Sequence, residues 1–493
     1  MENDYEETED LSVLINELSE KTESLDNTVE MVRKRSERVY QEEMSKNDFN
    51  EDFSGIVRKR DYKGKEDDTM ESTKPKRKLK KWAYLVFAAI VLLIGLIIFL
   101  VLHNKKVEEE KQNLIADIKS HYSEYVKVDK DTPIYDKNNK KIGTVYKDAI
   151  LKLEEEKVID EETKYFHVKD SVVNDYYISY DAVSKSNKQE TNSRYKRYLP
   201  FDKAVVASNF TLYLNNEKLI SFDEETEFPI IINDDNGMYY VEYNDMLVGI
   251  KKEEVKELQD YKIGDGKKNQ SYVTTYAYHR VYEENDKCTD PYLCISKNDF
   301  DTQMKYLSDN NYLTLTLNEL YLYLNGKLRV EKAVVITMDD GYLYKAAEEV
   351  LRKYNLNGTL FVITGDFADF TPFKELTNLE VQSHTNNLHR NYVCSGGNQG
   401  GAILCASQDK IKEDLESSNK KLGVEPIGIA FPFYDYNDNA IKALKAVGYK
   451  MSFIGRAGQL GRAKPGVTDL YKIPRMTVYA TKEMSFNEWK SYL

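Results

Sequence analysis

A chain of 493 residues is too long for one ordinary domain, so several domains are expected. The net charge of −13, with no basic domain and no nucleic-acid reader motif, argues against a nucleic-acid partner. All four cysteines follow residue 287: Cys288, Cys294, Cys394 and Cys405. Local Cys288–Cys294 and Cys394–Cys405 disulfides, which fit an oxidising compartment, are favoured over zinc binding because no CxxC spacing is present.

Residues 1–81 are polar and highly charged. Apolar residues recur every seven positions from Leu11 to Val39, but Lys21, Thr28 and Arg35 occupy the companion positions, so only half of a coiled-coil seam exists. We predict a mostly disordered tail with a nascent helix, and weak self-association through this tail remains open.

Residues 83–102 form an uncharged run of twenty residues. As a helix this run spans about 30 Å, the thickness of a bilayer core. Six lysines and arginines precede it between residues 74 and 81, whereas acidic residues follow at 108–110. The positive-inside rule therefore predicts a single-pass protein of the cell membrane, with residues 1–81 cytoplasmic and 104–493 outside. The run is too long, and too far from the start, for a cleaved signal peptide.

Residues 104–120 are predicted to form a helical stalk. Two strand-rich stretches follow at 121–186 and 195–258, with turns at Asn138-Asn139, Asn215-Asn216 and Asn236-Gly237. Each stretch suits a small β-barrel and resembles bacterial SH3 modules. Such modules are either wall-binding units or rigid spacers, and the sequence does not separate the two.

Residues 259–270 are polar and predict a linker, after which strands alternate with helices to residue 493. The predicted strands cover 274–278, 334–338, 358–364, 379–383, 427–433, 451–454 and 471–478. The predicted helices cover 299–307, 343–354, 409–422, 438–447 and 486–492. This alternation favours an α/β domain with a parallel sheet closed as a (β/α) barrel, whose active site collects at the carboxyl ends of the strands.

Two strand ends in this domain carry residues with metal chemistry. Asp339 and Asp340 end the run from Val334, and two histidines five residues apart, His384 and His389, follow the strand 379–383. One carboxylate and two imidazoles make a three-ligand site that leaves a position open for water. The second carboxylate is then available as a general base.

These residues resemble the motifs of a known family. Thr337–Gly341 (TMDDG) is similar to the first motif of the NodB-homology polysaccharide deacetylases, carbohydrate esterase family 4. The segment 384–389 (HTNNLH) looks like the second motif, and 430–434 (AFPFY) looks like a variant of the third. The resemblance covers 271–493 and implies a distorted (β/α) barrel that removes N-acetyl groups from N-acetylglucosamine polymers.

The resemblance also implies residue roles. Asp339 would be the base, and Asp340, His384 and His389 would bind zinc, or else cobalt, nickel or manganese. The backbone N–H of Phe433, between Pro432 and Tyr434, would hold the oxyanion. Ala430 stands where the family usually has an arginine, and no histidine follows His389.

A subgroup that acts on poly-N-acetylglucosamine looks circularly permuted, with a Tyr-His strand before the Asp-Asp motif. By that resemblance His279 would protonate the leaving amine, and Arg475 would replace the missing arginine. A histidine bonded to backbone and a surface ion pair are the open alternatives for these two residues.

The favoured function is a membrane-anchored extracytoplasmic metal-dependent N-deacetylase of peptidoglycan or a surface polysaccharide. An O-acetyl esterase on the same scaffold and a non-catalytic cell-wall-binding protein are the alternatives. The glycine-rich loop between Cys394 and Cys405 follows the second motif and is expected to line the substrate groove.

Overall fold

The structure is a computed structural model that describes residues 81–154, 164–188, 193–264, 266–288, 290–455, 460–480 and 483–493. The prediction of a disordered tail with a weak coiled coil falls on residues 1–80, which lie outside the described residues.

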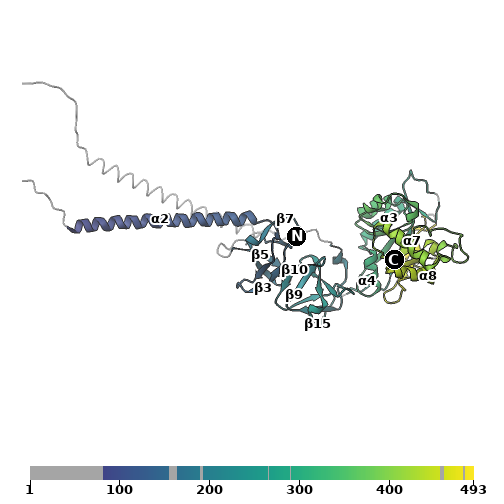
Figure 1. Ribbon diagram of the computed structural model, residues 1–493, viewed down its shortest axis with the longest axis horizontal. Coiled ribbons are helices and arrows are strands. Elements are labelled where there is room, and N and C mark those ends of the chain that lie inside the picture. The colour runs from purple at the N-terminus through teal and green to yellow at the C-terminus, as the bar shows by residue number, and fades with distance from the viewer. Residues whose placement is uncertain are drawn as a thin grey trace, which may run out of the picture. The chain divides into compact units, whose positions relative to one another are not determined.

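The predicted membrane segment and the predicted stalk belong to one continuous helix, α2 (Lys81–His121), shown in Figure 1. Of the described helices, only this one has the length and apolar composition needed to cross a membrane, over Leu85–His121. Its large apolar side chains between Leu85 and Leu102 are exposed. Towards the other end, Leu114 and Ile118 pack against the β-rich region that follows.

The β-rich region has fifteen strands among its described residues, 125–154, 164–188 and 193–260. They are β1 (Tyr125–Val128), β2 (Thr132–Tyr135), β3 (Lys141–Val145), β4 (Ile150–Lys152), β5 (Tyr165–Asp170), β6 (Asn174–Ser179), β7 (Val183–Ser186), β8 (Lys203–Ala207), β9 (Phe210–Leu214), β10 (Glu217–Phe222), β11 (Thr226–Pro229), β12 (Ile232–Asn233), β13 (Met238–Tyr243), β14 (Met246–Lys251) and β15 (Val255–Asp260).

The two predicted stretches are joined edge to edge. Each has its own three-stranded sheet, β4-β1-β7 and β11-β8-β15, and both contribute to a nine-stranded sheet in which β10 pairs with β3. The β9–β10 turn is made by Asn215 and Asn216, with φ of 50° and 68°, a conformation that asparagine tolerates. One hydrophobic core runs through both stretches.

The C-terminal region contains a parallel sheet in the order β22-β21-β20-β16-β26-β24-β23. Its strands are β16 (Val273–Tyr278), β20 (Ala333–Met338), β21 (Gly358–Val362), β22 (Leu379–Ser383), β23 (Gly428–Ala430), β24 (Met451–Gly455) and β26 (Ile473–Thr477). The short strands are β17 (Arg280–Tyr282), β18 (Cys294–Ser296), β19 (Leu313–Thr314) and β25 (Arg462–Ala463).

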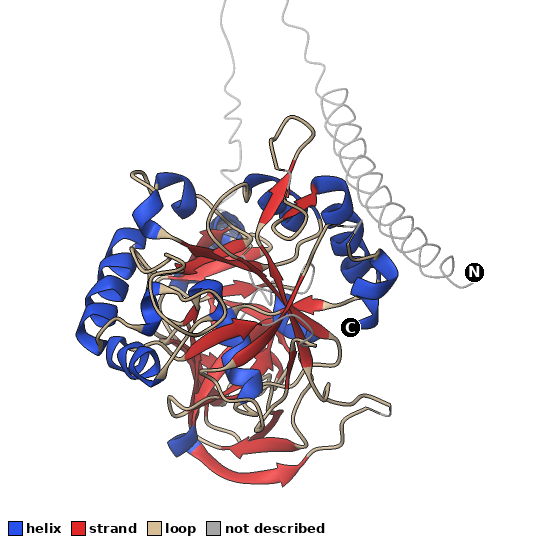
Figure 2. Ribbon diagram, turned by 90° about the vertical axis from the view of Figure 1, so that its right-hand side faces the viewer, coloured by secondary structure: helices blue, strands red, loops and turns tan. Residues whose placement is uncertain are grey.

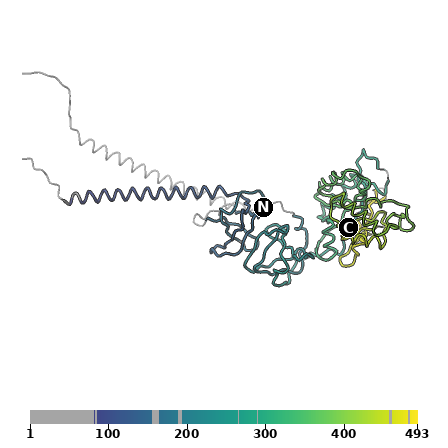
Figure 3. Tube along the Cα trace, in the orientation of Figure 1, coloured from purple at the N-terminus to yellow at the C-terminus, as the bar shows by residue number. Residues whose placement is uncertain are grey.

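Helices lie around the outside of this sheet (Figure 2), and the green-to-yellow trace of Figure 3 follows the same residues to the C-terminus. They are α3 (Lys297–Asp309), α4 (Leu317–Leu324), α5 (Lys345–Lys353), α6 (Thr371–Lys374), α7 (Gln408–Leu422), α8 (Asp438–Val447) and α9 (Phe486–Ser491). The two edge strands are linked by Gln382 of β22, whose Oε1 accepts from the N–H of Gly428 in β23 and from that of Ile427 just before it. The predicted (β/α) architecture is therefore confirmed as a near-barrel.

Local details differ from the predictions. The strand predicted at 427–433 ends at Ala430, and the chain then turns through Pro432–Tyr434. Helix α4 was not predicted, although Thr316 and Glu319 form a capping box at its start. Both predicted disulfides, Cys288–Cys294 and Cys394–Cys405, are present.

Candidate active site

The carboxyl ends of five parallel strands bring the predicted site residues together. Asp339 and Asp340 follow β20, His384 follows β22, and His279 follows β16. Arg475 lies within β26, and Phe433 follows β23. Parallel strands end at the same edge of a sheet, so residues far apart in sequence meet there.

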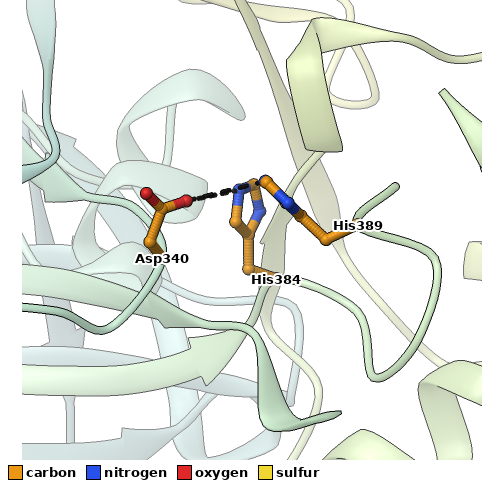
Figure 4. Close-up of side chains that lie close together, drawn as sticks. All are labelled: Asp340, His384 and His389. Carbon is orange, nitrogen blue, oxygen red and sulfur yellow. Dashed lines mark ion pairs between the residues drawn. The ribbon is translucent and has the colours of Figure 1, made fainter. Parts of the chain in front are cut away.

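Asp340, His384 and His389 form a cluster with three candidate metal ligands (Figure 4). Asp340 Oδ1 lies 3.5 Å from His389 Nε2 and 3.8 Å from His384 Nε2. His384 Nδ1 lies 2.8 Å from the Ala430 carbonyl, which can only accept, so Nδ1 is the donor and Nε2 is the ring nitrogen that faces Asp340. Burial lowers the pKa of His389 to about 4, so the imidazole of His389 is neutral near pH 7. This donor set fits a divalent ion of the zinc type.

The loop between the two histidines is held by helix α7. Asp414 of that helix accepts the N–H groups of Asn386 and Asn387, both at 2.7 Å. Thr385 adopts a left-handed backbone with φ of 71°. These contacts turn the chain back after His384, which explains how two histidines five residues apart reach the same carboxylate.

Asp339 lies beside this cluster and is held by Arg475. The guanidinium donates to both carboxylate oxygens, Nη1 to Oδ1 and Nη2 to Oδ2, each at 2.7 Å. Both side chains are buried, and Nη1 also donates to Thr337 Oγ1 at 3.0 Å. Burial alone would raise the pKa of Asp339, but Arg475 and His384 outweigh it and hold that pKa well below its usual range.

His279 faces the same carboxylate. Its Nε2 lies 4.0 Å from Asp339 Oδ2. Its Nδ1 is buried and has no hydrogen-bond partner among the described residues. Burial lowers the pKa of His279, although Asp339 and Asp340 act in the opposite direction. The lowered pKa favours the neutral ring, whose Nε2 is close to Asp339 but beyond hydrogen-bond distance.

The turn after β23 forms another wall of the site. Phe433 and Tyr434 are both left-handed, with φ of 55° and 59°. The Phe433 ring lies 4.4 Å from the His389 ring, and the Tyr434 hydroxyl lies 3.0 Å from Thr477 Oγ1. Pro432 is buried and begins the turn.

Two further residues of this region were not predicted from the sequence. Arg280 Nη2 lies 3.6 Å from Asp340 Oδ2, and its guanidinium stacks over the Tyr342 ring. Asp435 is buried directly after the left-handed pair. Arg280 could have been predicted as a site residue because it directly follows His279. Asp435 could not, because a single aspartate after Tyr434 indicates no particular role.

Comparisons with known proteins define the class to which this region corresponds. Residues 327–452 match the family model described as polysaccharide deacetylase. Residues 327–452 therefore correspond to a polysaccharide deacetylase domain, and the match together with the relatives below supports a hydrolase of the deacetylase type.

Individual relatives make the comparison more specific. YxkH of Bacillus subtilis (strain 168), a candidate polysaccharide deacetylase, is 28% identical over 199 residues, which are 40% of this chain and 68% of that protein. The poly-beta-1,6-N-acetyl-D-glucosamine N-deacetylase of Staphylococcus aureus (strain MSSA476) is 28% identical over 203 residues, 37% of this chain and 67% of that protein. Among solved structures, the Streptococcus pyogenes deacetylase PplD in complex with acetate is 24% identical, with a TM-score of 0.38, over 45% of this chain and 97% of that one.

Proposed function

We propose that this protein is a membrane-anchored, extracytoplasmic, metal-dependent hydrolase that removes N-acetyl groups from N-acetylglucosamine residues of peptidoglycan or a surface polysaccharide. The observation that carries the proposal is the buried Asp339–Arg475 pair beside the Asp340–His384–His389 cluster. This arrangement keeps one carboxylate ionised and oriented while three other side chains are available to a metal. The S. aureus relative, named as an N-deacetylase of poly-beta-1,6-N-acetyl-D-glucosamine, supports an amide substrate.

Asp340, His384 and His389 would hold the divalent ion, with zinc as the first choice and cobalt, nickel or manganese as alternatives. When bound, such an ion polarises the acetyl carbonyl and lowers the pKa of a water molecule. The remaining chemistry belongs to the side chains around it.

Asp339 is assigned as the base that takes a proton from the attacking water. Since Arg475 holds its pKa low, protonated Asp339 gives the proton up readily. His279 is neutral and lies 4.0 Å away, so we assign it to receive this proton and to pass it to the leaving nitrogen. The water thus supplies a hydroxyl group to acetate and a proton to the freed amine. An amine leaving group needs this protonation, which favours N-deacetylation over ester cleavage.

The turn 432–434 is assigned to the oxyanion. The N–H groups of Tyr434 and Asp435 donate to the carbonyls of Phe431 and Pro432 within the turn, at 3.0 and 2.9 Å. We assign the remaining N–H of the turn, that of Phe433, to the developing negative charge on the acetyl oxygen. One such donor contributes about a hundredfold to a thousandfold in rate.

The test is acetate release by the full-length protein in detergent micelles, loaded with zinc. The substrates are β-1,6- and β-1,4-linked N-acetylglucosamine oligomers, with acetylated xylan as the ester comparison. We expect release from the N-acetylated oligomers and a loss of at least about a hundredfold in Asp339→Asn. Asp369→Asn, which alters an exposed carboxylate bonded to its own turn, serves as the matched control. Equal release by Asp339→Asn and the parent would contradict the assignment, and release from xylan alone would identify an O-acetyl esterase.

Helix α2 supports the membrane anchor. We place residues 83–102 in the bilayer, 104–120 in a stalk outside it and the deacetylase domain (271–493) in the extracytoplasmic space. Alkaline carbonate extraction of cell membranes should leave the protein in the pellet. We assign 121–186 and 195–258 to SH3-like modules that hold the enzyme at the cell wall, which a sedimentation assay with purified walls tests directly.

A further inference from the structure

The turn that carries the assigned oxyanion donor has an unfavourable backbone. Phe433 and Tyr434 are consecutive non-glycine residues with φ of 55° and 59°. Side chains other than glycine, asparagine and aspartate rarely adopt this region, so such a conformation persists only where the surroundings hold it. The holding contacts come from the next residue in the chain and from a loop about thirty-five residues earlier.

Asp435 makes the first half of this hold. Asp435 is 2% exposed, and its carboxylate accepts three backbone N–H groups of the glycine-rich loop. They belong to Asn398, to Gln399 at 3.1 Å and to Gly401 at 2.9 Å. Because both carboxylate oxygens are used by these donors, Asp435 serves the loop and not a substrate.

Asn398 makes the second half. Its side-chain Nδ2 donates to the Phe433 carbonyl at 3.1 Å and to the Tyr434 carbonyl at 3.2 Å. The loop therefore binds the carbonyls of the strained turn through Asn398, while Asp435, the residue after the turn, binds the backbone of the loop. The loop and the turn thus stabilise each other, and the carbonyls that Asn398 binds belong to the two left-handed residues, Phe433 and Tyr434.

The loop is built to approach Asp435 closely. Gly397 has φ of 70°, and a Cβ atom there would lie 2.3 Å from Asp435 Oδ1. Gly400 has φ of 61°, and a Cβ atom there would lie 2.3 Å from the Cys394 carbonyl. The Cys394–Cys405 disulfide closes the loop covalently. These observations explain why a glycine-rich segment and a disulfide occur together here.

The turn touches both halves of the site. The Phe433 ring packs against His389, with ring centroids 4.4 Å apart. The Tyr434 ring faces the Arg475 guanidinium at 5.4 Å, and Arg475 holds Asp339. A shift of this turn would therefore move the assigned oxyanion donor relative to the assigned base.

We propose that Asp435 is a positioning residue for deacetylation, which acts with Asn398 and the Cys394–Cys405 loop to hold the Phe433 N–H in the place required for the oxyanion. This inference rests on the proposed function. In this proposal the loop closed by the Cys394–Cys405 disulfide supports the oxyanion donor in the transition state, so the loop does more than line the substrate groove. The predicted cost of losing the hold is therefore in kcat and not in KM, because an oxyanion contact strengthens only in the transition state.

The experiment compares Asp435→Asn and Asn398→Ala with the parent, with Asp438→Asn as control. Asp438 is exposed at the start of α8, three residues beyond Asp435. We expect Asp435→Asn to lower kcat at least about tenfold, with KM within about threefold and an unchanged metal content. Asn398→Ala, which leaves Asp435 and the fold of the loop intact, should lower kcat severalfold. Asp438→Asn should match the parent.

Hydrogen exchange gives a readout that does not depend on activity. A peptide that covers 431–437 should exchange faster in Asp435→Asn, in Asn398→Ala and in Cys394→Ser/Cys405→Ser. It should be unchanged in Cys288→Ser/Cys294→Ser, which opens the other disulfide. If the parent releases no acetate, the proposed function fails, and the exchange data still report whether Asp435 holds the turn. Parent-like kcat or parent-like exchange in Asp435→Asn would overturn the inference, and so would a loss of metal, because the residue would then support the metal ligands.

Discussion

The buried ion pair between Asp339 and Arg475 allows a quantitative prediction about the free energy of unfolding. The Arg475 side chain is 0% exposed, that of Asp339 is 3% exposed, and two hydrogen bonds of 2.7 Å join them. Removal of one partner of a buried pair leaves an uncompensated charge, which costs about 3–5 kcal/mol. We therefore expect Arg475→Met and Asp339→Asn each to lower the free energy of unfolding by about 3 kcal/mol or more. The double variant removes both charges, so it should be little worse than either single variant, with a coupling energy of about 3 kcal/mol.

The assay is urea unfolding of the metal-free protein, followed by the fluorescence of Trp489. This tryptophan is buried and stacks on Tyr276, with ring centroids 5.3 Å apart, so it reports on the deacetylase domain. The sequence has two tryptophans, and Trp82→Phe gives a background with a single reporter. A chelator removes bound metal, which would otherwise add its binding free energy to the free energy of unfolding. If the two single effects add to within about 0.5 kcal/mol, the pair does not couple and the reasoning is refuted.

Three further predictions follow from the site and its supports. His384→Ala should abolish stoichiometric zinc binding measured by mass spectrometry, because it removes a ligand that the Ala430 carbonyl orients. Asp414→Ala should weaken zinc affinity about tenfold to a hundredfold in a competition titration, because it frees the loop between the histidines. Burial raises the pKa of the Glu380 carboxyl from 4.5 to about 7 in the folded protein. Between these pH values the carboxyl is ionised in the unfolded chain but protonated in the folded one, so the free energy of unfolding falls as the pH rises. The loss is at most about 3 kcal/mol, and Glu380→Gln should show a correspondingly flatter dependence of unfolding free energy on pH between about 4.5 and 7. An identical dependence in both proteins would contradict this assignment.

The C-terminal architecture could be predicted because its signals are local and repeated. Strand β20 is buried along its whole length and reads as an apolar run, as strands of a parallel sheet do. Helix α7 begins at a serine cap and ends at Gly423 in the left-handed region, both of which are sequence signals. The cysteines are close enough in sequence that loop closure favoured local pairs, and those pairs are the ones formed.

The contacts that support the site were harder to predict, because they join residues far apart in the chain. Arg475 and Asp339 are 136 positions apart, and nothing in either local sequence specifies that their side chains meet. Here only resemblance to a family suggested the pairing. Asp435 and Asp414 had no such signal, since each is a single aspartate whose partners are backbone N–H groups of another segment. Short-range patterns predict elements, whereas these contacts depend on how the elements pack.

The distribution of backbone strain gives independent support for the position of the site. Most left-handed residues other than glycine are asparagine or aspartate, which tolerate this conformation in turns. Among the described residues, those of other types are Lys164, Leu343, Thr385, Tyr392, Phe433 and Tyr434. All except Lys164 lie within three residues of Asp340, His384, His389 or Pro432. Local sequence preferences are thus violated mainly close to the site residues that follow β20, β22 and β23, which is the expected signature of a site maintained for function at the expense of local stability.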